Sequence, residues 1–231
     1  VVGQASITEI AAEIENWDLL QKLPKQIGDF ILCPGSGIKG QILNIAAYIN
    51  KKTHCRLDLT YTSETFDYVP VKTVGLHTFR DERYFARDRE HFAKMLLQHL
   101  DDIIKSIDRK EVHKFDYEAE ALHFEQWDYW RSLPQLLEGY ELFITPENPL
   151  TYINGSFIFL DYTDFENGNQ VYFSYNIFRN EIFAEMKKDN LPLTTDAYDV
   201  GCNVADDKKL ELLTTLLQNN LQKTLEKLKK D

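Results

Sequence analysis

The stretch SFIFLDYTDFENGNQVYFSYNIF, residues 156–178, decides the predicted fold because it joins two strand-like runs by a turn. Phe, Ile, Tyr and Val dominate both runs, and these residues favour strands. The intervening ENGN, residues 166–169, contains an Asn-Gly pair that tolerates the positive φ of a tight hairpin turn. Both faces of the first run are apolar, which indicates a strand inside a sheet. We therefore predict an antiparallel hairpin at the centre of a sheet.

Two further stretches predict strands. CRLDLTYT, residues 55–62, alternates apolar and polar side chains, as a strand with one polar face does. FDYVPVKTVGLHTF, residues 66–79, continues the sheet, although Pro70 restricts its strand to an edge or a bend. Residues 41–50 are apolar enough for a helix and rich enough in Ile for a buried strand, so both interpretations stay open.

Helical patterns occupy much of the remaining chain. Ser6 and Glu9 have the spacing of a capping box and open a helix that ends before Pro24. The last helix carries Asp206 and Asp207 at its start and lysines at its end, which suits the helix dipole. The helices expected from such patterns span residues 6–23, 84–107, 116–131, 180–189 and 206–230.

Helices and strands come in clusters and do not alternate regularly, which favours an α+β fold. We expect a largely antiparallel sheet with the central hairpin at about 156–178, packed by several amphipathic helices that include a long C-terminal helix. The expected organisation is a single domain, residues 1–231, with a candidate internal division near residue 110. No internal repeat is expected.

Composition restricts the partners and the compartment. Acidic residues outnumber basic ones by 37 to 26, and the net charge of −11 disfavours nucleic acid and anionic membranes. The chain has no apolar run of about 20 residues and no secretion signal at its start, so we expect no membrane association. The three cysteines are scattered and odd in number, which fits a cytoplasmic protein.

The segment FILCPGSGIKGQ, residues 30–41, has the glycine spacing of a dinucleotide-binding fingerprint. Such a site needs a strand before the glycines and a helix after them, and residues 30–33 and 41–49 allow this. The following segments do not repeat the strand-helix-strand unit, and Lys39 stands before the last glycine, unlike in a Walker motif. A tight turn is the preferred interpretation. The alternative is a phosphate site formed by Gly35, Gly37, Lys39 and Gly40.

Four of the eight arginines lie in RDERYFARDR, residues 80–89. If this region is helical, Arg80, Arg83 and Arg87 share one face and can hold a phosphate or carboxylate. The interleaved Asp and Glu residues favour a salt-bridged helix start instead. The glycine segment and this arginine cluster, residues 80–89, would reinforce each other only if the fold brings them together.

A third pattern is the low-weight catalytic set Asp164, Glu185 and Lys187, with Asp161 as a substitute for Asp164. An Asp followed by Glu-x-Lys is the layout of Mg²⁺-dependent nucleases, in which the Glu-x-Lys lies on a strand. Here that tripeptide lies in an expected helix, which weakens the interpretation. The sequence assigns no metal ligand and identifies no cofactor.

The leading functional hypothesis is a non-catalytic cytoplasmic domain that binds or regulates another protein through an acidic, tyrosine-rich surface, with the terminal leucine helix as a second candidate surface. A basic protein would suit the charge as a partner. The alternatives are an enzyme or sensor for a phosphorylated or nucleotide-like ligand, which would use the glycines and arginines above, and a Mg²⁺-dependent nuclease. Oligomeric state is not predicted.

Overall fold

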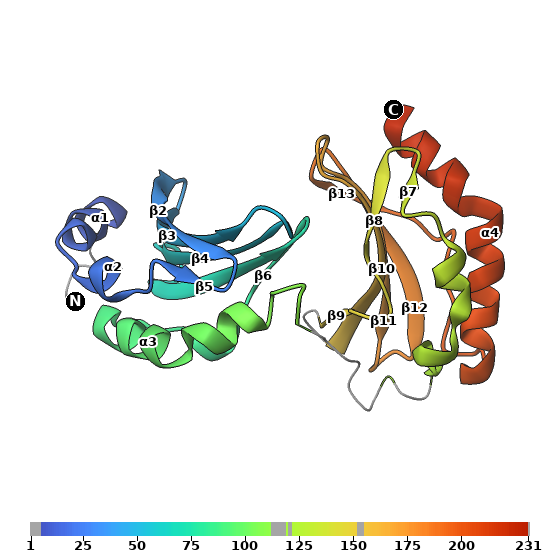
Figure 1. Cartoon of the computed structure of the whole chain (residues 1–231), viewed down its shortest axis with the longest axis horizontal. Helices are drawn as coiled ribbons and strands as arrows, with labels where there is room; N and C mark the ends of the chain where they lie inside the picture. The colour runs from blue at the N-terminus through green and yellow to red at the C-terminus, as the bar shows by residue number, and fades with distance from the viewer. Residues whose placement is uncertain (1–5, 112–118, 120–121, 152–154, 231) are drawn as a thin grey trace. The chain divides into compact units, whose positions relative to one another are not determined.

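The computed structural model of the chain describes residues 6–111, 119, 122–151 and 155–230 (Figure 1). The chain forms two compact units, Val1–Glu111 (unit 1) and Val112–Asp231 (unit 2). The boundary lies beside residue 110, where the sequence offered a candidate division. The expectation that the two units behave as one domain stays a prediction. Both sheets are antiparallel and each is accompanied by helices, which confirms the α+β class.

Unit 1 is a sheet with strand order β1-β2-β3-β4-β5-β6, so every strand pairs with its neighbours in sequence. Helices precede and follow this meander. The elements are α1 (Ile7–Glu15), α2 (Leu19–Lys22), β1 (Gln26–Ile27), β2 (Phe30–Lys39), β3 (Ile42–Asn50), β4 (Cys55–Thr62), β5 (Asp67–Val74), β6 (His77–Arg80), the 3₁₀ turn η1 (Glu82–Tyr84) and α3 (Arg89–Lys105).

Unit 2 has the sheet order β13-β12-β11-β10-β8-β7, and the short strand β9 pairs with β10. Among the described residues, the 3₁₀ turns η3 and η4 precede the sheet, and the long C-terminal helix follows it. The elements are η3 (Phe124–Gln126), η4 (Asp128–Ser132), β7 (Leu136–Leu137), β8 (Tyr140–Ile144), β9 (Leu150–Thr151), β10 (Ser156–Asp164), β11 (Asn169–Asn176), β12 (Glu181–Lys188), β13 (Leu191–Thr194) and α4 (Asp206–Lys230).

The ends of the helices follow the capping signals in the sequence. The Ser6 backbone N–H donates to Glu9 Oε2 at 2.6 Å, and Glu9 N–H donates to Ser6 Oγ at 3.3 Å. This confirms the expected capping box, which satisfies two amides at the start of α1. Asp88 starts α3 in a similar way, because its Oδ1 accepts a hydrogen bond from the His91 backbone N–H at 2.8 Å.

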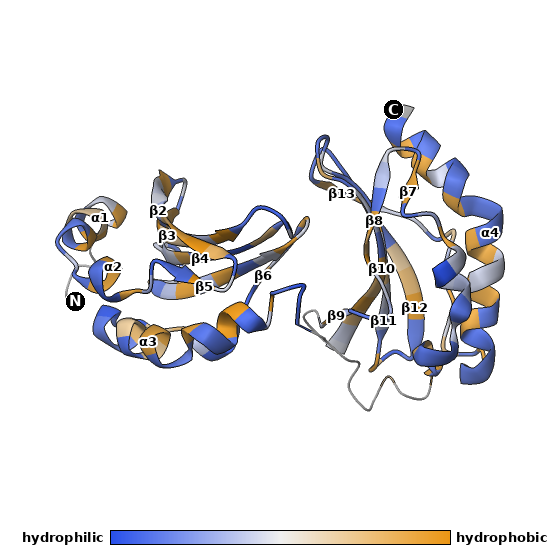
Figure 2. Cartoon of the chain, in the orientation of Figure 1, coloured by the Kyte–Doolittle hydropathy of each residue, from blue (hydrophilic) through white to orange (hydrophobic). Residues whose placement is uncertain are grey.

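Each unit has its own apolar core. In unit 1 the ring centroids of Tyr68 and Phe92, on β5 and α3, lie 5.5 Å apart, and Leu57, Leu59 and Leu96 are fully buried. Figure 2 shows that α3 and α4 both carry apolar and polar residues along their length, as amphipathic helices do.

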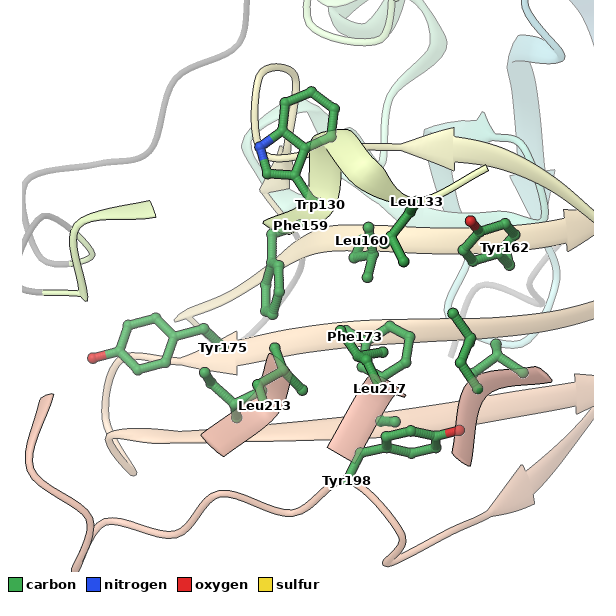
Figure 3. Close-up of a cluster of buried hydrophobic side chains, with 14 of the residues drawn as sticks. Trp130, Leu133, Phe159, Leu160, Tyr162, Phe173, Tyr175, Tyr198, Leu213 and Leu217 are labelled. Carbon is green, nitrogen blue, oxygen red and sulfur yellow. The ribbon is translucent and has the colours of Figure 1, made fainter. Parts of the chain in front are cut away.

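In unit 2 the leucine stripe of α4 packs on the sheet. Figure 3 shows Leu213 and Leu217 of α4 beside Phe173 of β11, in a cluster that also contains Trp130 and Leu133. All six leucines of the stripe are buried: Leu210, Leu213, Leu217, Leu221, Leu225 and Leu228. The stripe is therefore part of the core of unit 2 and does not provide the second candidate surface.

The two units share one plan, although no repeat was expected from the sequence. Strands β3 to β6 have the same lengths and spacings as β10 to β13, with a constant offset of 114 residues. The hairpin register is also the same, since Ile27 pairs with Phe30 in unit 1 and Leu137 pairs with Tyr140 in unit 2. The expectation of no internal repeat is therefore wrong.

One hydrogen bond occurs at equivalent places in the two units. The Tyr48 hydroxyl on β3 donates to the Pro24 carbonyl oxygen at 2.7 Å, and the Tyr162 hydroxyl on β10 donates to the Pro134 carbonyl oxygen at 2.6 Å. Both tyrosines are fully buried. Each bond ties the segment that precedes the first hairpin to the third strand of its sheet, so it fixes where the chain enters the fold.

Replacing either of these tyrosines with phenylalanine should lower the unfolding free energy by about 1 kcal/mol, because a buried carbonyl loses its hydrogen-bond donor. Urea unfolding of Tyr48→Phe and Tyr162→Phe measures the loss, and hydrogen exchange assigns it to unit 1 or unit 2. Replacement of the exposed Phe178 by leucine is a control for aromatic substitution at the surface. Wild-type stability in both tyrosine variants would contradict the role of the bond.

The structure corrects two local predictions and decides one open alternative. Residues 181–188, expected as a helix, form strand β12, in which Ile182 and Ala184 are buried on one face and Glu185 is exposed. Pairing with β11 and β13 outweighs the helix propensity of this segment. Residues 41–50, which were open to both interpretations, contain strand β3.

The second correction concerns the expected helix over 116–131. Residues 112–118 and 120–121 lie outside the described residues, and 124–132 form the short 3₁₀ turns η3 and η4. His123 has a left-handed backbone with φ 51°, and Trp127 has φ −83° and ψ 84°, so neither continues a helix. The aromatic residues here favour helices only weakly, and packing in the core determines their conformation.

Candidate functional site

The glycine segment belongs to strand β2 and to the hairpin that follows it. Gly35 and Gly37 lie in β2 at a register shift against β3, and Gly40 lies in the turn with φ +61°. Strand β3 follows the glycines, so the helix N-terminus that a dinucleotide site requires is not formed here. Gly35 and Gly37 instead line a groove of about 580 Å³ with the apolar Ile14, Trp17 and Leu43.

The arginines do not share a helix face, which corrects the expectation for 80–89. Arg80 is on the edge strand β6, Arg83 is in η1, and Arg87 lies between η1 and α3. Three strands separate β6 from β2, so the structure does not bring Arg80 and Arg83 to the glycine segment. The exposed Lys39 lies at the end of β2 and is not among the residues that line the groove.

A buried ion pair that the sequence did not predict lies beside Arg83. Lys72 Nζ on β5 is 2.7 Å from Asp81 Oδ2, and only 3% and 9% of these two side chains are exposed. Arg83 donates from Nε and Nη2 to the same carboxylate at 2.8 and 2.7 Å. Burial opposes ionisation of Asp81, but the hydrogen bonds from Arg83 and Lys72 outweigh it and hold the pKa of this carboxyl well below its usual range.

Burial also lowers the pKa of Lys72, and the hydrogen bond and charge of Asp81 offset this only in part. Because both partners are enclosed and Asp81 also binds Arg83, this cluster holds the bend between β6 and η1. Its role in the fold is structural, and Arg83 is engaged in it.

Arg87 belongs to a different place, a pocket of about 400 Å³ in unit 1. We call it the tyrosine pocket; its lining includes Glu13, Tyr61, Phe66, Tyr68, Arg87 and Arg89. Arg89 Nη1 is 3.3 Å from Glu13 Oε2, and Arg87 Nε is 3.6 Å from Asp67 Oδ1. Burial raises the pKa of Tyr68 to about 12, so its hydroxyl keeps its proton at neutral pH. This pocket is lined by more charged side chains than the glycine groove, and they have both signs.

The nuclease-like residues lie on β10 and β12 of the same sheet. Asp164 caps the β10–β11 turn, because its Oδ1 accepts hydrogen bonds from the backbone N–H groups of Glu166 and Asn167 at 3.1 Å. Glu185 and Lys187 do lie on a strand, β12, as the nuclease layout requires. The register pairs Glu185 with Tyr172, and Tyr172 with Asp161.

The register thus aligns Asp161, and not Asp164, with Glu185. Strand β11 lies between these two residues, so their backbones are two strand spacings apart, about 10 Å. Burial lowers the pKa of Lys187, and Asp161 and Glu185 offset this in part. Gln170 Nε2 donates to Asp161 Oδ2 at 2.7 Å. Among the residues that the structure describes, no three His, Cys, Asp or Glu side chains are placed to hold a metal ion.

The negative charge of the chain is concentrated in unit 2. Unit 1 contains 15 basic and 16 acidic residues, and unit 2 contains the remaining 11 basic and 21 acidic residues. Four of these acids, Glu181, Glu185, Asp196 and Asp199, form what we call the acidic face. Glu181, Glu185 and Asp199 line a recess of about 360 Å³ together with Arg179. Partial burial raises the pKa of Asp199, and the nearby Asp196 and Glu181 raise it further.

The exposed aromatic and apolar residues differ from those expected. Of the ten tyrosines that the structure describes, eight are buried: Tyr48, Tyr61, Tyr68, Tyr140, Tyr162, Tyr172, Tyr175 and Tyr198. Most tyrosines in the described part of the chain therefore belong to the cores. The large apolar side chains that are most exposed include Phe178 (80%) and Leu191 (68%), both in unit 2.

Comparison of the chain with protein-family models, curated proteins and solved structures finds no match. None of the helices in the described part of the chain combines the length and apolarity that a bilayer crossing needs. The three cysteines, Cys33, Cys55 and Cys202, are all unpaired. The functional argument therefore rests on charge, burial and pocket geometry.

Proposed function

We propose that this protein is a cytoplasmic, non-catalytic module that binds another protein, and that unit 2 attracts a basic partner. The observation that carries the proposal is the uneven charge, since unit 2 has 21 acidic residues against 11 basic ones. Such a field extends over about 8–10 Å at physiological salt and speeds the encounter with a positively charged surface. Unpaired cysteines are compatible with a reducing compartment.

The acidic face provides the contact region of this proposal. Its recess is lined by Glu181, Glu185 and Asp199 together with the aromatic Phe183, a combination that suits a guanidinium or ammonium group. Arg179 Nη1 already forms an ion pair with Glu181 Oε1 at 2.8 Å, and 69% of the Arg179 side chain is exposed. A partner arginine can therefore displace an exposed internal one at low energetic cost.

Phe178 adds an apolar contact to the same region. It precedes Arg179 in the turn between β11 and β12 and is 80% exposed. Exposed aromatic residues beside charged groups are common in the centres of protein interfaces, where most of the binding energy arises. The acidic face would thus give attraction and orientation, and Phe178 would give affinity.

The test is a pair of charge-reversed variants with the same change in net charge. Glu181→Lys with Asp199→Lys should weaken binding of a partner captured at low salt by at least about tenfold, because it removes complementary charge from the acidic face. Glu64→Lys with Glu82→Lys, at exposed positions of unit 1, is the matched control and should change the affinity little. Titration calorimetry with the purified partner at two salt concentrations measures both effects.

Equal weakening by the two double variants would mean that only net charge matters, and it would remove the acidic face from the proposal. Binding that does not weaken with salt would contradict the electrostatic attraction. Turnover of a small substrate by the isolated chain would contradict the non-catalytic assignment.

A further inference from the structure

Two tyrosines of unit 1 are buried without using their hydroxyl groups. Tyr61 on β4 and Tyr68 on β5 are directly paired, each is 4% exposed, and their ring centroids lie 5.0 Å apart. Within the described part of the chain neither hydroxyl forms a hydrogen bond, and neither oxygen is fully enclosed. Both residues line the tyrosine pocket. Both hydroxyl oxygens are therefore open to the tyrosine pocket, where they can bind water or a ligand.

The equivalent place in unit 2 is closed by internal bonds. Tyr175 occupies the position of Tyr61, and its hydroxyl donates to Asn180 Oδ1 at 3.1 Å. Asn180 in turn donates from Nδ2 to Asp206 Oδ1 at 3.0 Å. Ile182 takes the position of Tyr68 and has no hydroxyl. The shared fold therefore does not require free hydroxyls here, and their presence in unit 1 is particular to that unit.

The charges around the pocket have both signs. Arg87 and Arg89 are positively charged, and Glu13 and Asp88 are negatively charged. The Arg87 side chain is 87% exposed and its Nε is 3.6 Å from Asp67, beyond hydrogen-bond distance, so its donors can reach a ligand. A simple anion would meet repulsion from the carboxylates, whereas a zwitterion can pair with both sets of charges.

The remaining wall of the pocket is apolar. Ile10 of α1 and Phe66 of the β4–β5 turn line the pocket together with the two tyrosines. The volume of about 400 Å³ is in the range of small-molecule sites. A ligand that fills this space would carry an apolar group in addition to its charges.

We propose that the tyrosine pocket binds a free α-amino acid with an apolar side chain. Arg87 and the hydroxyls of Tyr61 and Tyr68 bind the carboxylate, Glu13 and Asp88 hold the ammonium group, and Ile10 and Phe66 contact the side chain. The inference concerns unit 1 and is independent of the acidic face in unit 2.

The test uses the full chain and measures binding of L-leucine and L-phenylalanine by calorimetry and by thermal unfolding. Two analogues each lack one charged group of leucine: 4-methylpentanoate has no ammonium group, and 3-methylbutylamine has no carboxylate. Each should bind at least about tenfold more weakly than leucine. Inorganic phosphate should not bind. Tight binding of phosphate or of the carboxylate analogue alone would overturn the proposal in favour of an anion site, and no binding of either amino acid would overturn it outright.

Tyr68→Phe separates binding from stability. It should weaken amino acid binding at least about tenfold with no decrease in Tm, because the hydroxyl that is removed has no hydrogen-bond partner among the residues that the structure describes. Tyr175→Phe in unit 2 is the matched control, since it removes a bonded hydroxyl and should lower Tm without a change in amino acid affinity. Unchanged affinity in Tyr68→Phe would overturn the proposal.

Discussion

Asp81→Ala is expected to lower the unfolding free energy of unit 1 by about 3–5 kcal/mol, which is the usual effect of removing one partner from a buried ion pair. Lys72 is then left with its ammonium group enclosed and without its carboxylate. Urea unfolding measures the loss, and hydrogen exchange should place it in β5 and β6. A loss below about 1 kcal/mol, typical of a surface pair, would contradict the structure of the cluster.

Unit 2 provides the control for this variant. The position equivalent to Lys72 is Met186, and the position equivalent to Asp81 is Thr195, at the common offset of 114 residues. Combining Lys72→Met with Asp81→Thr removes both charges and should recover most of the stability, because apolar replacement of a whole buried pair is often neutral. If the double variant is as unstable as Asp81→Ala, the loss arises from packing and not from an unpaired charge.

The same carboxylate makes the stability of unit 1 depend on acid. The folded pKa of Asp81 is well below its unfolded value of about 3.9, so its contribution is fully present above about pH 4. The contribution is lost as the pH falls from there toward the folded pKa. Unfolding measured between neutral and strongly acidic pH should therefore show a steeper acid dependence in wild type than in Asp81→Ala.

Gly35→Ala is the second substitution with a large expected effect, about 3 kcal/mol or more. A Cβ atom at Gly35 would lie 2.0 Å from the Asn44 carbonyl oxygen and 2.5 Å from the Ile45 carbonyl carbon. These are backbone atoms of the neighbouring strand, so no side-chain rotation can relieve the contact. Urea unfolding of the variant measures the cost.

Gly37→Ala is the matched control for this substitution. Gly37 has φ +80° and open space around its added Cβ, so alanine there should cost only about 1–2 kcal/mol for the left-handed backbone. Equal losses at the two glycines would contradict the close approach of β2 and β3. Nucleotide binding by the two variants distinguishes a packing role of these glycines from a phosphate-binding role, since a phosphate site would lose nucleotide binding in either variant.

Some elements could be predicted because their signals are local. The capping box of α1, the amphipathic pattern within 89–105 and the leucine stripe of α4 each depend on residues a few positions apart. The helix predicted over 180–189 was wrong because these residues suit both a helix and a strand. Pairing of β12 with β11 and β13 selects the strand. The shared plan was missed because the paired strands have few identical residues. A local signal existed, since ENWDLLQKLP at 15–24 and EQWDYWRSLP at 125–134 share Glu, Trp, Asp, Leu and Pro.

The candidate site could be predicted only in part. Arg87 was singled out from the arginine cluster, and it lines the tyrosine pocket. Tyr61, Tyr68 and Glu13 were missed because they come from β4, β5 and α1, and only the folded sheet brings them together. A signal for Tyr61 and Tyr68 existed in the alternation of strands β4 and β5, which places both tyrosines on the core face, but it does not show that their hydroxyls lack partners.

The meander order of both sheets has a consequence for synthesis on the ribosome. Tandem copies of one plan can exchange equivalent strands while they fold, a common route to misassembly. Here each strand joins a neighbour close in sequence, so the first copy can complete its sheet while the second is still being made. A swapped β5 would also bring Lys72 to the place of Met186, without the Asp81 that neutralises it. The sequence differences between the two units thus disfavour the exchange of equivalent strands between them during synthesis.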